Sequence, residues 1–464
     1  MNKIFGKTKR IHFIGIGGIG MSGMAEFLYN YDFKITGSDI NTSERTLHLT
    51  KMGIKISQEH RKENITSANL IVYSSAVPYD NPEITEGKRL KIPIVKRAEL
   101  LGELIKIKET SIAVSGTHGK TTAASMISSI LIEAQLDPTI IIGGIVNKFN
   151  NNNISGLGDI IVVEADEFDK SFLSLNPTFS IINNMELEHL DIYKDIEDLK
   201  TTFTQFANSI PFYGSVCICG DFKELINILP RIKRNYKTFG VNNKSVDVRA
   251  KNINFRENKT FFDILINNKK IDFQLNVPGL HNVYNALAAI TLCLEIEINI
   301  EHIVNGLNSY NGVKRRFDVK YDKINNSNIM LIDDYAHHPT EVKATIDAIN
   351  SGWEGRRIIA VFQPHLYSRT KDFYKDFSNA LMKSNINILL PIYPAREKPI
   401  KNISSLLIKE QLNIGGHPET YHCRNKNLLP ELINKIKKNN DIIVFMGAGD
   451  IYKSINPTYQ KLNE

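Results

Sequence analysis

The sequence predicts an α/β protein with three domains and mostly parallel sheets. A chain of 464 residues is too long for a single core, because domains average roughly 150 residues. In addition, an apolar strand, a turn rich in glycine or acid and a helix follow one another near Ile11, Ile112 and Ile329. Strands that alternate with helices in this way favour parallel sheets covered by helices on both faces.

The first of these segments has a strand at 11–14, glycines at positions 15, 17 and 20, and a helix expected over 21–28. Asp39 follows the next strand, at 34–38. Taken alone, this pattern matches a dinucleotide-binding loop, with a pyrophosphate on the helix N-terminus and the acid on a ribose. It indicates a diphosphate more reliably than a nicotinamide. Glycines needed only for close strand–helix packing would give the same pattern.

The second segment is the sequence SGTHGKTT at 115–122, between a strand at 112–114 and a helix expected over 123–131. Its glycines allow backbone N–H groups to approach phosphate oxygens, Lys120 can reach the β- and γ-phosphates, and the Thr121 hydroxyl can bind Mg²⁺. Val114 stands where the full phosphate-loop motif has its first glycine. The segment predicts nucleoside triphosphate binding, and the alternative is a loop rich in Gly, Lys and Thr by chance.

Two acidic segments follow strands downstream of this loop. Glu164 ends the apolar run 160–163, which is where a Mg²⁺ ligand is expected beside a phosphate loop, and the acids that follow it include ordinary solvated charges. His189 lies in NNMELEHLD, at 183–191. Since Mg²⁺ prefers oxygen ligands, the residues alone leave His189 open between a structural and a metal-binding role.

The third segment is a strand at 328–334 that ends in two carboxylates, followed by a helix that Pro339 opens and that runs through Ile349. The chain then closes with a strand at 442–445 and the glycine turn 447–450. Ligands collect at the carboxyl ends of strands in open α/β sheets, so this turn is a candidate for another binding loop.

Two polar groups remain. Asn282 and Asn285 precede an alanine-rich helix, where side-chain amides either recognise a base edge or cap the helix. Arg316, in the run KRRFD, suits bidentate phosphate binding or a solvated surface.

Composition restricts the class of protein further. A hydrophobic fraction of 42% and a charged fraction of 23% are typical of a soluble globular chain, and no run approaches the roughly 18–20 apolar residues that span a bilayer. The basic N-terminus lacks a signal-peptide core, so we expect a cytoplasmic protein. The net charge of +7 is spread along the chain, without the basic stripe that nucleic-acid binding favours. The 4 cysteines form no metal or disulfide framework, which predicts buried free thiols.

Polar stretches at 106–110 and 320–327 suggest domain boundaries. We therefore expect domains at 1–108, 109–319 and 320–464. The asparagine run 150–153 is expected to form a surface loop, since Asn favours turns.

Taken in order, the motifs resemble those of the Mur ligases of peptidoglycan synthesis, most closely the branch that adds L-alanine to UDP-N-acetylmuramate. They are HFIGIGGIGMSG, SGTHGKTT, VVEADEFDKSFL, NNMELEHLD, HNVYNA, GVKRRFD, DDYAHHPTEV, FQPHLYSRT and GAGDI, and they cover essentially the whole chain. The resemblance implies a Rossmann-like N-terminal domain for the UDP-sugar, a central P-loop ATPase domain and a Rossmann-like C-terminal domain for the amino acid. It thereby reassigns the first glycine loop from a nicotinamide cofactor to the UDP diphosphate.

The resemblance also implies residue roles. ATP would be bound by Gly116, Thr117, His118, Gly119, Lys120, Thr121, Thr122, Asn282, Asn285, Arg316 and Asp334. The UDP-sugar would contact Gly15, Gly17, Gly18, Gly20, Asp39 and His118, and the amino acid would contact His337 and Arg369. Mg²⁺ would be held by Thr121, Glu164 and His189, and catalysis would depend on Lys120, His189 and Arg316.

The implied reaction is the ATP-dependent ligation of L-alanine to the lactyl carboxylate of UDP-N-acetylmuramate through an acyl phosphate, by a monomer or homodimer that neither binds nucleic acid nor inserts into a membrane. Leu366 stands where many members have Arg, and Phe168 stands where a small polar residue is commoner, so amino-acid selectivity is the feature most open to change. Two alternatives are a ligase that attaches a preformed tripeptide to the same UDP-sugar and an NAD-binding regulatory NTPase.

Overall fold

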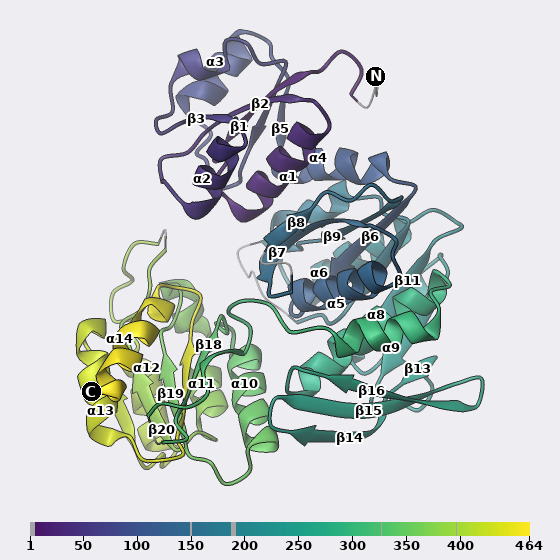
Figure 1. The fold of residues 1–464 in the computed structure, drawn as a ribbon. Helices are drawn as coiled ribbons and strands as arrows, with labels where there is room; N and C mark the ends of the chain where they lie inside the picture. Colours follow the sequence, from purple (N-terminus) through teal and green to yellow (C-terminus); the bar gives the residue numbers. More distant parts are fainter. Residues whose placement is uncertain (1–4, 149–150, 187–191, 326, 396) are drawn as a thin grey trace. The chain divides into compact units, whose positions relative to one another are not determined.

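The computed structural model describes residues 5–148, 151–186, 192–325, 327–395 and 397–464 (Figure 1). The chain divides into two compact units: Met1–Lys251, Asp263–Asp272 and Tyr284–Tyr310 form the first, and Asn252–Phe262, Phe273–Val283 and Asn311–Glu464 form the second. Helices alternate with several mostly parallel sheets, which confirms the predicted α/β class. The predicted boundaries at 108/109 and 319/320 remain predictions.

The first sheet carries the N-terminal glycine loop. Its strands run in the order β3-β2-β1-β4-β5 and are all parallel. They are β1 (Arg10–Ile14), β2 (Lys34–Ser38), β3 (Lys55–Ser57), β4 (Leu70–Tyr73) and β5 (Ile94–Lys96), with helices α1 (Ile19–Asn30), α2 (Glu44–Lys51), α3 (Pro82–Arg89) and α4 (Arg97–Leu104). Because the strands are parallel, the carboxyl ends of β1, β2 and β4 lie at one edge, and the loop 15–18 leaves from that edge.

The second sheet carries the SGTHGKTT loop. Its order is β13-β12-β11-β10-β6-β9-β7-β8. The strands are β6 (Thr110–Ser115), β7 (Thr139–Val146), β8 (Asn151–Ile154), β9 (Ile160–Glu164), β10 (Phe179–Ile182), β11 (Ser215–Cys219), β12 (Tyr236–Gly240) and β13 (Val248–Arg249). The accompanying helices are α5 (Lys120–Glu133), α6 (Ile196–Asn208), α7 (Lys223–Ile228), α8 (Leu280–Glu295) and α9 (Ile300–Asn308). Only β8, among the strand pairs given for this sheet, runs antiparallel to its neighbour.

The surface loop expected at 150–153 is wrong for residues 151–153, and residue 150 lies outside the described residues. Asn152 and Asn153 are buried in β8. The Asn152 amide donates to the carbonyls of Ile142 at 3.3 Å and Ile19 at 3.2 Å. The Asn152 amide can enter a buried strand because it finds these partners, which lie in segments that the local sequence does not reveal. Among the described residues, the side-chain amide of Asn153 has no hydrogen-bond partner.

A smaller sheet, in the order β14-β15-β16, contains β14 (Lys251–Arg256), β15 (Lys259–Ile266) and β16 (Lys269–Leu275). The last sheet lies in the second unit, in the order β17-β18-β22-β19-β20-β21, with β17 antiparallel. Its strands are β17 (Asp318–Tyr321), β18 (Met330–Asp334), β19 (Ile358–Phe362), β20 (Ile386–Leu389), β21 (Thr420–His422) and β22 (Ile442–Met446). Its helices are α10 (Pro339–Gly352), α11 (Tyr367–Leu381), α12 (Leu406–Ile414), α13 (Leu429–Ile436) and α14 (Ile455–Asn463).

Alternate residues of this sheet face two separate cores, as a period of two requires. Ile332 and Ala360 belong to a core that includes residues of α10, α11 and α12, whereas Leu331 and Val361 belong to one that includes residues of α13 and α14. The sheet is therefore covered on both faces, as predicted. The helix expected to start at Pro339 is confirmed.

The four cysteines are all buried and free, as the sequence predicted. Among the described residues, no helix combines the length and apolar character that crossing a membrane requires.

Candidate active site

The SGTHGKTT segment joins the end of β6 to the start of α5, as predicted. Gly119 caps the helix in a left-handed conformation, with φ +82°. A Cβ at this position would lie 2.3 Å from Oδ1 of Asn285, so both the backbone and the close contact require glycine. The His118 N–H donates to Oδ1 of Asn184 at 2.7 Å, and Thr117 Oγ1 accepts from the Glu186 N–H at 2.9 Å. The loop is thereby fixed against the segment that follows β10.

Lys120 is the first residue of α5, and its ammonium lies among carboxylates. Nζ donates to Oε2 of Glu167 at 2.6 Å and to the Gly116 carbonyl at 2.8 Å, and Asp166 lies at 3.8 Å. Burial alone would lower the pKa of Lys120, but Glu167, Asp166 and Glu164 outweigh it and raise the pKa. Lys120 is therefore a cation at neutral pH. The acids after Glu164 were expected to include ordinary solvated charges, and Glu167 is not one of them, because it is 2% exposed and bonds the lysine.

Glu164 and Thr121, two predicted Mg²⁺ ligands, lie together. Glu164 ends β9; its carboxylate accepts from the Gly143 N–H at 2.5 Å and also hydrogen-bonds the Thr121 side chain. Burial raises the pKa of Glu164. A carboxylate and a hydroxyl supply the oxygen donors that Mg²⁺ prefers, so these two residues fit the ion. The third predicted ligand, His189, lies outside the described residues.

His118 and Thr122 complete the predicted loop residues. Thr122 lies in the first turn of α5. Nε2 of His118 is 3.5 Å from the Glu186 carboxylate, which follows β10. The sequence quoted Glu186 only as part of a motif, so its proximity to the loop was not anticipated.

The two asparagines predicted to contact ATP both lie on α8, inside the helix rather than before it. Asn282 donates from Nδ2 to the Pro278 carbonyl at 2.7 Å. Asn285 accepts from the side-chain amide of Asn183 at 3.2 Å, and both asparagines of α8 are 5% exposed. Asn285 therefore belongs with the phosphate loop through Asn183 and Gly119.

In the second unit, Asp334 ends β18 and is buried. Its carboxylate accepts from Thr345 Oγ1 at 2.7 Å and from the Ala336 N–H at 3.0 Å. Burial raises the pKa of Asp334 to about 6, although Thr345 and Arg316 oppose the shift. The final glycine turn adjoins the same strand end, because the Gly447 N–H donates to the Asp334 carbonyl at 3.0 Å.

Glu341 organises the residues that follow β18. Its carboxylate accepts from the N–H of His337 at 3.0 Å, lies 3.1 Å from Nδ1 of His337, and lies 3.4 Å from Nη1 of Arg316. The guanidinium of Arg316 also stacks over Tyr335 at 5.2 Å. Glu341 was missed, although a glutamate at the third position of a helix that starts with proline is a capping signal.

Arg369 lies in the first turn of α11, just after Leu366, whose φ is +69°. His365 stacks on Tyr393 at 5.8 Å, and its ring centroid is 6.0 Å from that of His337. Burial, together with His337 and Arg369, lowers the pKa of His365 to about 4, so this ring is neutral at pH 7. The structure brings the predicted His337 close to His365, which the sequence did not single out.

The first glycine loop lies at the carboxyl edge of the N-terminal sheet. Gly15 has φ +78°, and the Gly17 N–H donates to Oδ2 of Asp39 at 2.8 Å. Gly18 caps α1, and Gly20 lies inside it. Two arginines that the sequence did not indicate lie beside the loop. Arg45 donates to the Gly17 carbonyl at 3.4 Å, and Nη1 of Arg97 lies 3.0 Å from the position a Cβ would take on Gly20.

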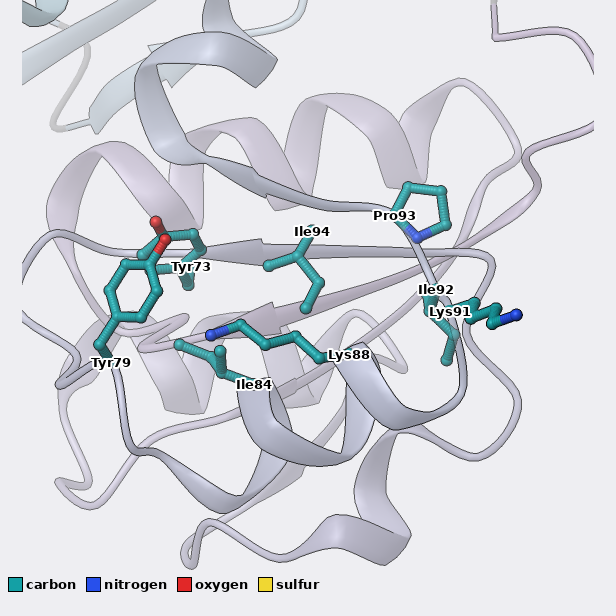
Figure 2. Close-up of a pocket in the computed structure, with 8 residues that line it drawn as sticks. All are labelled: Tyr73, Tyr79, Ile84, Lys88, Lys91, Ile92, Pro93 and Ile94. Carbon is teal, nitrogen blue, oxygen red and sulfur yellow. The ribbon is translucent and has the colours of Figure 1, made fainter.

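A separate pocket of about 400 Å³ lies between α3 and β5 of the same sheet (Figure 2). Its floor includes Ile84 and Ile94, and Lys88 Nζ stands 4.3 Å from the centre of the Tyr79 ring. None of the predicted site residues lines it.

Three family models match the chain. They are described as Mur ligase family, catalytic domain, at residues 10–109; Mur ligase middle domain, at 114–293; and Mur ligase, glutamate ligase domain, at 315–449.

Among curated proteins, the UDP-N-acetylmuramate–L-alanine ligase of Geotalea daltonii is 42% identical over 99% of this chain and 100% of its own. The protein of the same name from Salinibacter ruber is 40% identical over 97% of this chain and 94% of its own. Among solved structures, the UDP-N-acetylmuramate–alanine ligase of Thermotoga maritima has a TM-score of 0.81 at 29% identity and covers 97% of this chain and 98% of that one. A murein peptide ligase from Psychrobacter arcticus shares the fold, with a TM-score of 0.71 at 22% identity over 98% of this chain and 99% of that one.

Proposed function

The chain belongs to the Mur ligase family, and from this membership we propose how its residues carry out the reaction. It joins L-alanine to the lactyl carboxylate of UDP-N-acetylmuramate, with the use of ATP, in peptidoglycan precursor synthesis. The observation that carries this conclusion is identity of about 40% over nearly the full chain to relatives that bear this name. The three-domain architecture predicted from the resemblance is that of the family.

In the first step, an oxygen of the lactyl carboxylate attacks the γ-phosphorus of ATP, the bond to the bridging oxygen breaks, and ADP leaves. We assign Lys120 to the β- and γ-phosphates and Arg316 to the phosphates as well. Both side chains would neutralise charge that develops on the transferring group, which is the main catalytic contribution in phosphoryl transfer. To take this role, Lys120 would exchange its contact with Glu167 for a phosphate oxygen.

We assign Mg²⁺ to Thr121, Glu164 and His189. When bound, the ion supplies positive charge that offsets the charge of the phosphate oxygens. The support for this site is the pair of oxygen donors that Glu164 and Thr121 place together. Asn282, Asn285 and Asp334 are assigned to the adenosine part of ATP on the basis of the family resemblance.

In the second step, the amine of L-alanine attacks the acyl carbon, a tetrahedral intermediate forms, and inorganic phosphate leaves as the amide bond is completed. Arg369 would pair with the alanine carboxylate, and His337 would face the amino acid. An α-amino group has a pKa near ~8 in water, so a usable fraction is neutral at pH 7 and a dedicated base is not required. His337 and His189 remain the candidate proton acceptors.

We further propose that the enzyme acts in the cytoplasm, where ATP and nucleotide sugars are available, as a monomer or homodimer without nucleic acid or membrane insertion. Size-exclusion chromatography with light scattering would measure the oligomeric state. A larger assembly would contradict this part of the proposal.

Phosphate release from ATP, UDP-N-acetylmuramate and Mg²⁺ tests the function, with L-alanine, glycine, L-serine and the tripeptide compared as acceptors. We expect the highest kcat/KM with L-alanine and no release when Mg²⁺ is omitted. Release only with the tripeptide would move the chain to the recycling branch. No release with any acceptor would contradict the assignment.

Arg369→Ala tests the amino-acid assignment. Loss of a charge-assisted pair with the alanine carboxylate should raise the KM for alanine roughly 10- to 100-fold and leave the KM for ATP unchanged. Lys371→Ala, an exposed position on the same helix, is the matched control. An unchanged KM for alanine in Arg369→Ala would show that the pocket lies elsewhere.

A further inference from the structure

A fully buried carboxylate lies at the carboxyl edge of the N-terminal sheet, and no substrate contact is assigned to it. The side chain of Glu83, near the start of α3, is 0% exposed. It accepts hydrogen bonds from Ser38 Oγ at 2.6 Å and from the Asn64 amide at 2.6 Å. Nδ1 of His60 lies 3.0 Å from one of its oxygens, and Nε2 of His12 lies 3.4 Å from the other.

These partners come from separate elements. His12 is on β1, Ser38 ends β2, and His60 and Asn64 follow β3, while Glu83 follows β4. His12 is itself held through Nδ1, which is 2.9 Å from Thr36 Oγ1 on β2. One carboxylate therefore connects four parts of the sheet at the edge from which the first glycine loop departs.

The carboxylate is charged at neutral pH. Burial acts to raise the pKa of Glu83, but hydrogen bonds from His12, Ser38 and Asn64 outweigh burial and lower it. A buried charge is costly unless all its acceptor positions are used, and here both oxygens have donors. Replacing one of those donors or the acceptor is expected to disturb the whole group, because partly satisfied buried networks are unfavourable.

Ser38 connects this group to the glycine loop. While its hydroxyl donates to Glu83, its carbonyl accepts from the Gly15 N–H at 2.8 Å and from the Ile16 N–H at 3.1 Å. The next residue, Asp39, accepts from the Gly17 N–H. The end of β2 thus fixes three successive amides of the loop, and Glu83 fixes the end of β2.

We propose that Glu83 is a positioning residue for the UDP-sugar. It holds Ser38, and through Ser38 it sets the orientation of the loop amides at Gly15 and Ile16. This inference rests on the proposed function, which assigns that loop to the UDP diphosphate. Glu83 does not touch the substrate, so its effect is confined to binding of the UDP-sugar and does not extend to phosphoryl transfer.

Glu83→Gln tests the inference in the full-length enzyme. An amide keeps one acceptor oxygen and replaces the other with an NH₂ group, so either the Ser38 hydroxyl or the Asn64 amide loses its acceptor. We expect the KM for UDP-N-acetylmuramate to rise about tenfold, with kcat and the KM values for ATP and L-alanine within about twofold of the wild type. Glu86→Gln, on the same helix and paired only with Arg89 among the ion pairs of the described residues, is the matched control and should change nothing.

Ser38→Ala is the second variant, because it removes one donor and leaves the backbone carbonyl in place. It should raise the KM for UDP-N-acetylmuramate about threefold. If Glu83→Gln does not fold, Ser38→Ala tests the positioning role by itself. An unchanged KM for the UDP-sugar, or an equal loss in every kinetic constant, would overturn the positioning role.

Calorimetric titration of the wild type and of Glu83→Gln with UDP-N-acetylmuramate distinguishes a failure of the proposed function from a failure of the positioning role. Wild-type binding with equal affinity in Glu83→Gln would overturn this inference alone. Absence of wild-type binding would overturn the proposed function and this inference with it.

Discussion

The two glycine loops of the first unit have the same local form and differ in where their charges come from. Each follows a central parallel strand, contains a glycine with positive φ and opens a helix. In the second loop, the cation is Lys120, within the motif. In the first loop, the nearby cations are Arg45 on α2 and Arg97 on α4, which only the fold places beside it.

The acids differ as well. At the second loop, Glu164 and Glu167 contact Thr121 and Lys120, an arrangement that suits a metal and a triphosphate. At the first loop, Asp39 accepts from a loop amide and the motif at 12–23 contains no lysine, which suits a diphosphate and a ribose. Glycine spacing therefore indicates phosphate binding, whereas the charged residues around the loop indicate which phosphate.

The largest expected effect is on the second loop. Lys120→Ala should lower kcat roughly 10³-fold, because a charge that stabilises the transferring phosphoryl group is removed. The KM for UDP-N-acetylmuramate should stay near that of the wild type. Phosphate-release kinetics measure both, and Lys106→Ala, an exposed lysine before β6, is the control. Retained turnover would remove Lys120 from its role.

Gly119→Ala tests whether the second loop requires the left-handed backbone and close contact that glycine allows. The left-handed φ and the 2.3 Å approach to Asn285 would strain an alanine by about 1–3 kcal/mol. We expect the KM for ATP to rise roughly 10-fold or more. Gly355→Ala has a similar φ of +78° and nothing within 4 Å, so its change in the free energy of unfolding reports the cost of the conformation alone, and its KM for ATP should equal that of the wild type. Equal kinetics for both variants and the wild type would show that the loop tolerates a side chain.

Arg97→Ala tests the cation supplied by the fold. If its guanidinium helps to hold the UDP diphosphate, the KM for the UDP-sugar should rise about tenfold and that for ATP should not change. Lys96→Ala, the exposed neighbour at the end of β5, is the control. A rise in the KM for ATP alone would break the comparison between the loops.

The smallest effect is expected for Gly18→Ala. The nearest atom to a new Cβ is 3.5 Å away, an ordinary contact, and the backbone is extended. All kinetic constants should remain within about twofold of the wild type. A tenfold loss would mean that the substrate itself approaches this position closely.

The features that could be predicted from the sequence are those set by local motifs, and the features that could not are those set by tertiary packing. The sheet class, the helix at Pro339 and both glycine loops followed from local pattern, because strand, turn and helix signals are short-range. Glu164 and Thr121 were also anticipated, because a carboxylate at the end of a strand beside a phosphate loop is where a Mg²⁺ ligand is expected.

Residues far apart in sequence were not anticipated. His365 and Arg97 gain their positions from packing of the sheets, and no local signal sets them apart, whereas the capping position of Glu341 was a local signal that was missed. The loop prediction for the asparagines of β8 was wrong for a related reason at Asn152, because its partner Ile19 lies in the helix that follows a strand of another sheet. Sequence pattern locates the loops, and tertiary structure supplies the groups that differentiate them.

The most direct test crosses two variants with two ligands by calorimetry: Lys120→Ala and Arg97→Ala, each titrated with ATP plus Mg²⁺ and with UDP-N-acetylmuramate. We predict a crossed result, in which Lys120→Ala weakens only ATP binding and Arg97→Ala weakens only UDP-sugar binding. Equal weakening of the binding of both ligands by either variant would contradict the assignment of the two loops to separate substrates.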